Sequence, residues 1–143
     1  GHAKCVKFNK GKIANAVRAS ISIPGIFDVV NSKDQVLVDG GVIDPVGTVW
    51  LKGKYDLVIV VNVNTAESRE VNQRSKLIDV VLKSFEIMQR EIVHDKIKNL
   101  DNVVLIEPHL KGLRLTDMHK GKQFVKRGEI AAKKAMRKIK KFL

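Results

Sequence analysis

The sequence predicts an α/β domain with a mostly parallel sheet, because short apolar runs alternate along it with longer stretches of helical periodicity. The clearest apolar run, residues 56–63, is almost continuous in β-branched side chains. Such a run is typical of a parallel strand that helices cover on both faces. The clearest helical pattern spans residues 74–99, where apolar residues recur mostly at spacings of three and four. The length of 143 residues indicates one domain with room for a core.

The first part of the chain predicts a strand followed by a helix. Residues 4–8 show a weak alternation of apolar and polar side chains, which favours a short strand. Residues 12–19 have helical spacing after a turn. Pro24-Gly25 ends this region, and the residue before a proline is biased toward extended backbone.

A second short strand is expected over residues 36–38, and the pair Gly40-Gly41 ends it sharply. Residues 44–54 contain one proline and two glycines, which argue against a regular helix there. Beyond the strand at residues 56–63, residues 64–73 are polar and predict a loop.

The last part predicts a buried strand over residues 102–107 and a final helix or helix pair over residues 121–142. One side of this helix is expected to be apolar, formed by Ala132, Ala135, Met136, Ile139 and Leu143.

Asp39 is the most informative single residue. It follows the short strand and precedes two glycines. Loops at the carboxyl ends of parallel strands form the usual active-site edge, and glycines allow the chain to turn sharply there. A carboxylate in that place can accept a proton from a hydroxyl nucleophile or bind a metal. Asp-Gly is also a common turn, and local chemistry alone favours the turn.

Several separate blocks, taken together, resemble the patatin-like phospholipase family in their order and spacing. These blocks are Ala-Val-Arg-Ala-Ser-Ile-Ser-Ile-Pro-Gly-Ile-Phe at residues 16–27, Leu-Val-Asp-Gly-Gly-Val-Ile at residues 37–43, the strand at residues 56–63 with its following long helix, Ile-Glu-Pro at residues 106–108, and Gly-Glu-Ile-Ala-Ala at residues 128–132. The resemblance covers nearly all of the chain.

This resemblance implies a three-layer α/β/α lipid acyl hydrolase that uses a Ser–Asp dyad. The family's aspartate lies in an Asp-Gly-Gly motif, which corresponds to Asp39 here, and it accepts the proton of the serine. Gly40, Gly41, Pro24 and Gly25 are interpreted as residues that support this site. The implied substrate is a lipid or another acyl ester.

The sequence departs from the family at the nucleophile. The family's serine lies in Gly-x-Ser-x-Gly, after a glycine-rich oxyanion loop, and none of the six serines here has a glycine two residues away on either side. Ser20 and Ser22 are assigned to helix termination and to packing around the site. Asp44-Pro45 stands where family members often show Asn-x-Pro, which alters the local loop.

Because the absent elements precede this region in the family, we interpret residues 3–143 as the C-terminal part of an incomplete patatin-like acyl hydrolase domain. Gly1 and His2 are interpreted as a cleavage scar from an expression tag. Alone, the chain is expected to be nearly inactive on esters. An open strand edge and open apolar faces predict self-association, or pairing with the missing N-terminal half.

The net charge of +12 is concentrated in residues 120–143, which carry ten basic residues and one acidic residue. The basic side chains predict a solvated helix face or a contact with an anionic membrane. Nucleic acid is disfavoured, because few aromatic residues are interleaved with the charges. The alternative function is therefore a non-catalytic basic α/β interaction domain that binds an anionic membrane or nucleic acid.

Neither a cofactor nor a metal is expected. His94, His109 and His119 do not share the spacing of a helical metal pair, so hydrogen-bonded or solvated histidines are expected. The single cysteine, Cys5, excludes an internal disulfide and fits a reducing compartment. No apolar run approaches the ~20 residues of a membrane span. We expect a cytoplasmic protein, with peripheral membrane contact through the basic C-terminal helix as a second possibility.

Overall fold

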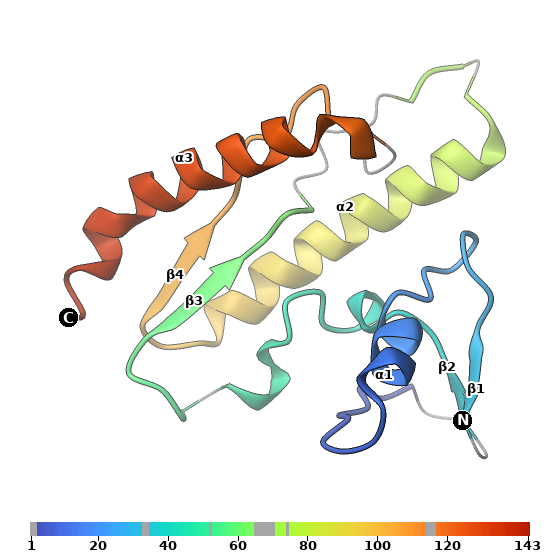
Figure 1. Ribbon diagram of the computed structural model, residues 1–143, viewed down its shortest axis with the longest axis horizontal. Helices are drawn as coiled ribbons and strands as arrows, with labels where there is room; N and C mark the ends of the chain where they lie inside the picture. The colour runs from blue at the N-terminus through green and yellow to red at the C-terminus, as the bar shows by residue number, and fades with distance from the viewer. Residues whose placement is uncertain (1–2, 33–34, 52, 65–70, 74, 114–116) are drawn as a thin grey trace.

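The computed structural model describes residues 3–32, 35–51, 53–64, 71–73, 75–113 and 117–143 (Figure 1). Its elements, in chain order, are α1 (Ile13–Ser20), β1 (Val30–Ser32), β2 (Gln35–Leu37), the 3-10 turns η1 (Gly40–Val42) and η2 (Thr48–Trp50), β3 (Val58–Val61), α2 (Leu77–Lys98), β4 (Val103–Ile106), the 3-10 turn η3 (Met118–Lys120) and α3 (Gly121–Ile139). The α/β class predicted from the sequence is confirmed. Most of the predicted loop at residues 64–73 lies outside the described residues.

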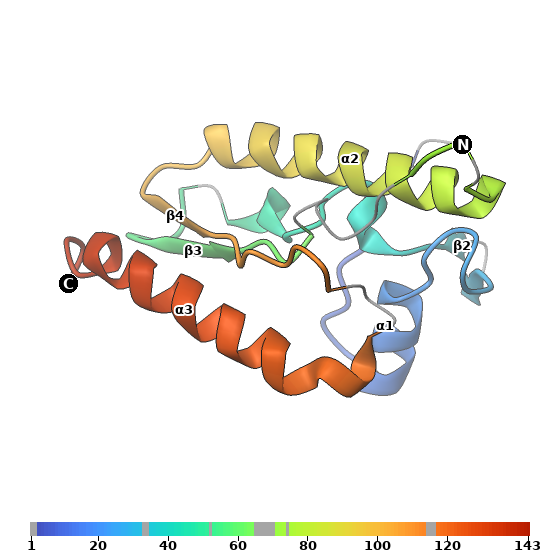
Figure 2. The same ribbon diagram turned by 90° about the horizontal axis from the view of Figure 1, so that it is seen from above.

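Strands β3 and β4 form a parallel pair, in which Val58 lies opposite Val103 and Val61 lies opposite Ile106. Helices α2 and α3 lie on opposite sides of this pair (Figure 2). A parallel connection needs a crossover, and α2 provides it between the two strands. Both predicted strands and both predicted helices are confirmed here.

The core beneath α3 is formed with β4. Val104 and Ile106 of the strand are buried against Ala135 and Ile139 of the helix. Ala131 packs against the same cluster, so the buried side of α3 recurs every four residues, as one face of a helix does. The predicted stripe is therefore right at Ala135 and Ile139. It is wrong at Met136 and Leu143, which are 40% and 95% exposed.

The expectation that both faces of β3 are buried is wrong. Val58 and Val60 are buried, but Ile59 and Val61 are 47% and 53% exposed. Paired residues of neighbouring strands share a face, so Ile59 and Val61 lie on the same face as Val104 and Ile106. Helix α3 covers that face over β4 and leaves it open over β3. We call the side chains of Ile59 and Val61 the open β3 face.

The sheet prediction is also wrong for the N-terminal part. Strand β2 pairs with β1 as an antiparallel hairpin, with Asn31 opposite Val36, and does not join the parallel pair. Residues 4–8 form no strand. The predicted helix is confirmed as α1. Within the described residues, the chain therefore has two separate two-stranded sheets, because the backbone of β2 pairs with its neighbour in sequence, β1.

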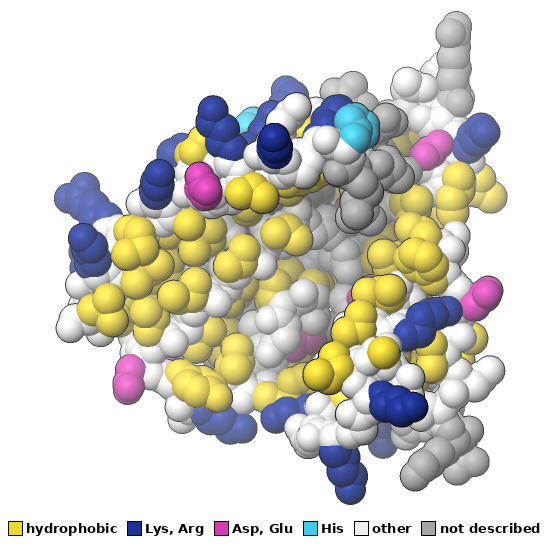
Figure 3. Space-filling model, in the orientation of Figure 1, with side chains coloured by type: hydrophobic (Ala, Val, Ile, Leu, Met, Phe, Trp, Pro, Cys, Tyr) yellow, Lys and Arg dark blue, Asp and Glu magenta, His cyan; other side chains and the backbone are white. Residues whose placement is uncertain are grey.

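The molecule exposes more surface than a compact protein of its mass. Its accessible surface is 10,965 Å², whereas a folded monomer of 16.0 kDa is expected to expose about 7,400 Å². Apolar side chains contribute to this excess on α1, β3 and α2, and Figure 3 shows hydrophobic patches on either side of a hollow in one face. Large exposed apolar areas mark surfaces that another polypeptide or a membrane covers.

Candidate active site

Asp39 lies between β2 and η1, where it caps the first turn of η1. Its side chain is half-buried, and Oδ1 accepts a hydrogen bond from the backbone N–H of Gly41 at 2.6 Å. A bond from an N–H to an ionised carboxylate is stronger than one between neutral groups. Among the described residues, the Asp39 carboxylate accepts no other hydrogen bond. Its second oxygen is therefore available to a further donor.

The backbone N–H of Asp39 donates to the backbone carbonyl of Ser22 at 2.9 Å. Ser22 is 1% exposed and follows α1. This bond brings the two most characteristic blocks of the sequence together, because one contains Ser22 and the other Asp39. The position of Asp39 is thus fixed by a contact that crosses between α1 and β2.

Ser22 has a structural role, in agreement with its assignment from the sequence. Its hydroxyl donates to the Arg18 carbonyl at 2.9 Å and accepts from the Arg18 guanidinium at 2.7 Å. The same guanidinium donates to the carbonyl of Asp28 at 3.0 Å. A buried hydroxyl with both roles filled is not free to act as a nucleophile.

The two glycines after Asp39 differ in how much space surrounds them. Neither has a positive φ, so the sharp turn does not depend on a left-handed conformation. Gly41 is buried, and a Cβ placed there would meet the Gln89 amide and lie 2.9 Å from Asp39 Oδ1. A Cβ on Gly40 would meet nothing within 4 Å. A side chain at Gly41 would therefore displace the ends of these two side chains, whereas one at Gly40 would displace nothing.

Pro24 and Gly25 form a turn beside this region. Ile26 donates to the carbonyl of Ile23 at 3.0 Å, and Gly25 has a φ of +81°. Proline followed by a residue of positive φ is the pattern of a type II turn. A Cβ on Gly25 would lie 3.5 Å from Ile78 of α2, so the turn packs near that helix. Neither residue lines the cavity described next.

A cavity of about 680 Å³ opens beside Asp39. Asp39, Gly40 and Gly41 lie on its wall together with Ser20 and Cys5. The rest of its lining is mainly apolar and includes Val6, Phe8, Leu37, Val42, Ile43 and Trp50. A volume in this range suits a small molecule or part of a lipid chain, and the apolar wall favours a hydrocarbon group.

Cys5 on this wall is a half-buried free thiol. Burial is the main cause that raises its pKa above the usual value, and the carboxylate of Asp44 adds to the effect, while Lys96 opposes it. The thiol is therefore mostly neutral near pH 7, and it behaves as a small apolar side chain.

Asp44 has a role that sequence reasoning missed. It is 7% exposed, and its carboxylate accepts from the Thr48 hydroxyl at 3.0 Å and from the Val49 N–H at 2.8 Å. It thus fastens the turn η2, and its carboxylate is used by the fold. The spacing Asp-x-x-x-Thr was the available signal for this interaction.

A second polar cluster, which the sequence analysis did not predict, lies at the carboxyl ends of β3 and β4. Asn62 is 2% exposed, and its amide donates to Glu107 at 2.8 Å. His94 of α2 lies 3.9 Å from the same carboxylate. Asn62 also accepts from the Asn64 N–H at 3.1 Å, and the Asn64 side chain donates to Gln89. Two asparagines closing a buried strand are the sequence signal for this cluster.

The described residues contain no group of three or more histidine, cysteine or acidic side chains that could hold a metal ion. His109 and His119 are exposed. Helices α1, α2 and α3, as far as they are described, include none that is both long and apolar enough to cross a bilayer.

Comparison with known proteins gives a family match and several curated relatives. Residues 2–50 match the family model for patatin-like phospholipase. An uncharacterized NTE family protein of Mycobacterium tuberculosis is 38% identical over 66 residues, which are 46% of this chain and 18% of that protein. A protein of Mycobacterium bovis with the same description matches equally. A further M. tuberculosis NTE family protein is 51% identical over 35 residues, or 24% of this chain and 6% of that protein.

These matches cover less than a fifth of the length of the curated relatives. The family-model match at residues 2–50 includes the two blocks that the Ser22–Asp39 hydrogen bond joins. Residues 2–50, the segment that holds Asp39, are therefore similar to the patatin-like phospholipase family, whereas the sequence resemblance was expected over nearly all of the chain.

Proposed function

We propose that this chain supplies Asp39 as the proton acceptor of a Ser–Asp acyl hydrolase site whose serine and oxyanion donors lie outside these 143 residues. The observation that carries the proposal is the state of the Asp39 carboxylate. One oxygen is held by the Gly41 N–H, and the group stands half-buried on the wall of an apolar cavity. A carboxylate oriented in this way can accept the proton of a hydroxyl brought beside it.

The proposed reaction transfers the acyl group of the ester to the serine and then to water. The serine hydroxyl gives its proton to Asp39 as its oxygen bonds to the carbonyl carbon of the ester, and backbone N–H groups stabilise the oxyanion. The protonated Asp39 then gives the proton to the leaving alcohol, and an acyl-serine remains. A water molecule repeats the sequence, which releases the carboxylic acid and restores the serine hydroxyl and the Asp39 carboxylate. The apolar cavity would hold the hydrocarbon part of the ester.

The choice of Asp39 over the other buried acids rests on their partners. Asp44 is buried, but its carboxylate accepts two hydrogen bonds that hold η2. Asp117 is 5% exposed and bonds Lys120 at 2.9 Å. Asp39 is the described acid that lines the apolar cavity with an oxygen to spare.

The excess surface supports a site completed by a second segment. Nearly 11,000 Å² are exposed where a compact chain of this mass exposes about 7,400 Å². We infer that a serine-bearing segment, or a second copy of the chain, covers the open β3 face and the apolar surface near the cavity. The whole assembly would then hydrolyse acyl esters, including lipids.

The test compares the chain alone with the chain joined to a patatin-like segment that carries Gly-x-Ser-x-Gly. We expect negligible hydrolysis of p-nitrophenyl butyrate by the chain alone and clear turnover by the joined protein. In the joined protein, Asp39→Asn should lower kcat by about 10²–10⁴-fold. Asp101→Asn, at an exposed position away from the cavity, is the matched control and should leave kcat unchanged.

Two results would contradict the proposal. One is a joined protein whose turnover survives Asp39→Asn. The other is turnover by the chain alone that Ser20→Ala abolishes, because Ser20 lines the cavity with Asp39 and would then be the nucleophile.

A further inference from the structure

Gln89 reaches from the middle of α2 to the turn that carries Asp39. Its amide nitrogen occupies the space directly over Gly41, where a Cβ would collide with it. The same Cβ would lie 2.9 Å from Asp39 Oδ1. The ends of the Gln89 and Asp39 side chains therefore both lie beside the same face of Gly41, although they come from different parts of the chain.

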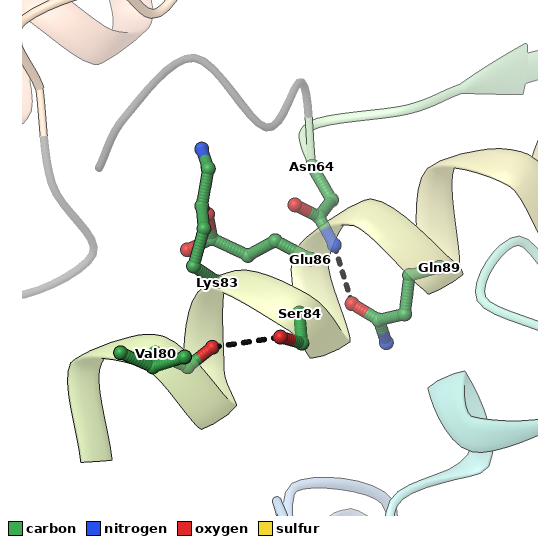
Figure 4. A network of polar contacts seen from close by, with 6 residues as sticks. All are labelled: Asn64, Val80, Lys83, Ser84, Glu86 and Gln89. Atoms are coloured by element: carbon green, nitrogen blue, oxygen red, sulfur yellow. Dashed lines mark hydrogen bonds and ion pairs between the residues drawn. The ribbon is translucent and has the colours of Figure 1, made fainter. Parts of the chain in front are cut away.

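The other end of the Gln89 amide is held in place. Its oxygen accepts a short hydrogen bond from the Asn64 side chain, as Figure 4 shows. The Asn64 N–H is bonded to Asn62 at 3.1 Å, and the buried Asn62 amide is bonded to Glu107 at 2.8 Å. Gln89 is thus anchored to the carboxyl ends of β3 and β4.

We propose that Gln89 is the positioning residue of the Asp39 turn, because its anchored amide holds Gly41 in the place from which the Gly41 N–H orients the Asp39 carboxylate. The inference deepens the proposed function and rests on it for its catalytic meaning. It links Asp39 to the parallel strand pair, although β2 is not a member of that sheet. Asp39 is connected to the sheet through the Gln89 side chain of α2. In an ordinary α/β site, the catalytic residue follows a strand of the sheet directly.

The consequence for catalysis follows from distance. Without the Gln89 amide, Gly41 can move into the vacated space, and its N–H no longer fixes Oδ1. A misplacement of about 1 Å costs on the order of 100-fold in rate when a proton must pass between aligned groups. Gln89 would act through Gly41 and Asp39 and would not touch the substrate.

The experiment uses the 143-residue chain labelled with ¹⁵N. Amide hydrogen exchange is measured at Gly41 in the unmodified chain and in the Gln89→Ala and Gln89→Glu variants. Arg90→Ala is the matched control, since Arg90 is the next residue of α2 and is exposed. The exchange of Asn62, whose N–H donates to Ile106 at 2.9 Å, monitors the parallel strand pair.

We expect Gly41 to exchange at least about tenfold faster in Gln89→Ala, as the loss of a bond to a charged group implies. In Gln89→Glu, the bond from Asn64 can persist while a carboxylate replaces the amide nitrogen near Asp39. If the Gly41 amide then exchanges faster while the Asn62 amide does not, the amide nitrogen of Gln89 is the group that holds Gly41 in place. The Arg90→Ala control should match the unmodified chain at both positions.

The proposal is overturned if Gly41 exchanges at its original rate in both Gln89 variants. It is also overturned if Gly41 and Asn62 accelerate together, since Gln89 would then only stabilise the fold. In the joined protein, Gln89→Ala should lower kcat and leave KM nearly unchanged. If the joined protein hydrolyses esters equally well with Asp39→Asn, the proposed function is refuted but the role of Gln89 in the fold is not. If activity depends on Asp39 but the Gly41 exchange rate is unchanged in the Gln89 variants, only the role of Gln89 is refuted.

Discussion

The backbone N–H of Asp39 donates a hydrogen bond to the carbonyl of Ser22 at 2.9 Å, and this contact holds the candidate catalytic turn against the end of α1. Ser22 is in turn fastened to Arg18 through both its hydroxyl and the guanidinium. The support of Asp39 is therefore a chain of polar contacts, and each link can be removed separately.

Ser22→Ala removes the hydroxyl link and leaves the Arg18 guanidinium short of an acceptor. Because the side chain is 1% exposed, we expect the free energy of unfolding to fall by about 1–3 kcal/mol. Urea unfolding followed by circular dichroism measures the change. Ser84→Ala is the control, because Ser84 is exposed and its hydroxyl donates to the Val80 carbonyl within the same helix. Equal losses in the two variants would show that the Ser22 hydroxyl does not support the turn.

Gly41→Ala places a methyl group against Asp39 Oδ1 and the Gln89 amide. Both neighbours are the ends of side chains, so the fold can survive while the carboxylate is displaced. We expect a normal circular dichroism spectrum and a loss of roughly 100-fold in kcat of the joined protein. Gly128→Ala, in α3 with open space around it, is the control and should retain full kcat. A fully active Gly41→Ala would show that the Gly41 N–H does not orient Asp39.

Cys5 reports on the cavity, because it is the one cysteine of the chain and lies on the cavity wall. Its pKa is raised by burial and by Asp44, so the folded protein should react with iodoacetamide more slowly at pH 8 than the urea-unfolded chain. The raised pKa also means that the thiol's contribution to stability is present below the pKa of the unfolded chain and is lost as pH rises through the folded value. Equal alkylation rates in the two states would contradict this.

A hydrophobic ester, or a non-hydrolysable ether of similar shape, that occupies the cavity should slow the alkylation of Cys5 further. The measurement is the alkylation rate with and without a non-hydrolysable long-chain ether at a fixed pH. Protection that grows with chain length would support a hydrocarbon-binding cavity, and an unchanged rate would place the ligand elsewhere.

The open β3 face is expected to drive association of the isolated chain. Ile59 and Val61 are about half exposed, because α3 packs over the neighbouring strand β4 and leaves β3 uncovered. Double substitution of both residues by threonine keeps the strand preference and removes apolar area. Sedimentation velocity should show concentration-dependent association that this variant weakens. Val36→Thr, on the exposed face of β2, should not weaken it. A strictly monomeric unmodified chain would contradict the expectation.

The basic face of α3 is proposed to contact an anionic membrane. Its exposed cations include Lys133, Lys134, Arg137 and Lys138, and the exposed Lys140 and Lys141 follow directly after the helix. Each cation near an anionic surface contributes about 1 kcal/mol, and salt screens the effect. The fraction of protein that sediments with phosphatidylserine vesicles should fall when Lys133 and Lys134 are changed to glutamate. It should fall less when Arg90 and Lys98 of α2 are changed to glutamate. Equal binding to neutral vesicles, or preferential binding of nucleic acid, would contradict the membrane proposal.

The helices and the parallel strands were predictable because their patterns are local. Periodicity of three and four over residues 74–99 predicted α2, and β-branched runs predicted β3 and β4. The burial of β3 was not predictable from its composition. Its run of valines and isoleucine is as apolar as a strand covered on both faces, but coverage depends on where α3 packs, and α3 packs over β4.

The sequence by itself determined the α/β class, the approximate bounds of the three helices, and Asp39 with its two glycines as the candidate site, because these follow from local spacing and from a motif. Only the tertiary structure decided that β2 pairs with β1, and that the Gln89 amide and the Asp39 carboxylate both lie beside Gly41. Each of these depends on contacts between residues far apart in the chain. Such contacts are set by how the elements pack and leave no periodic trace in the sequence.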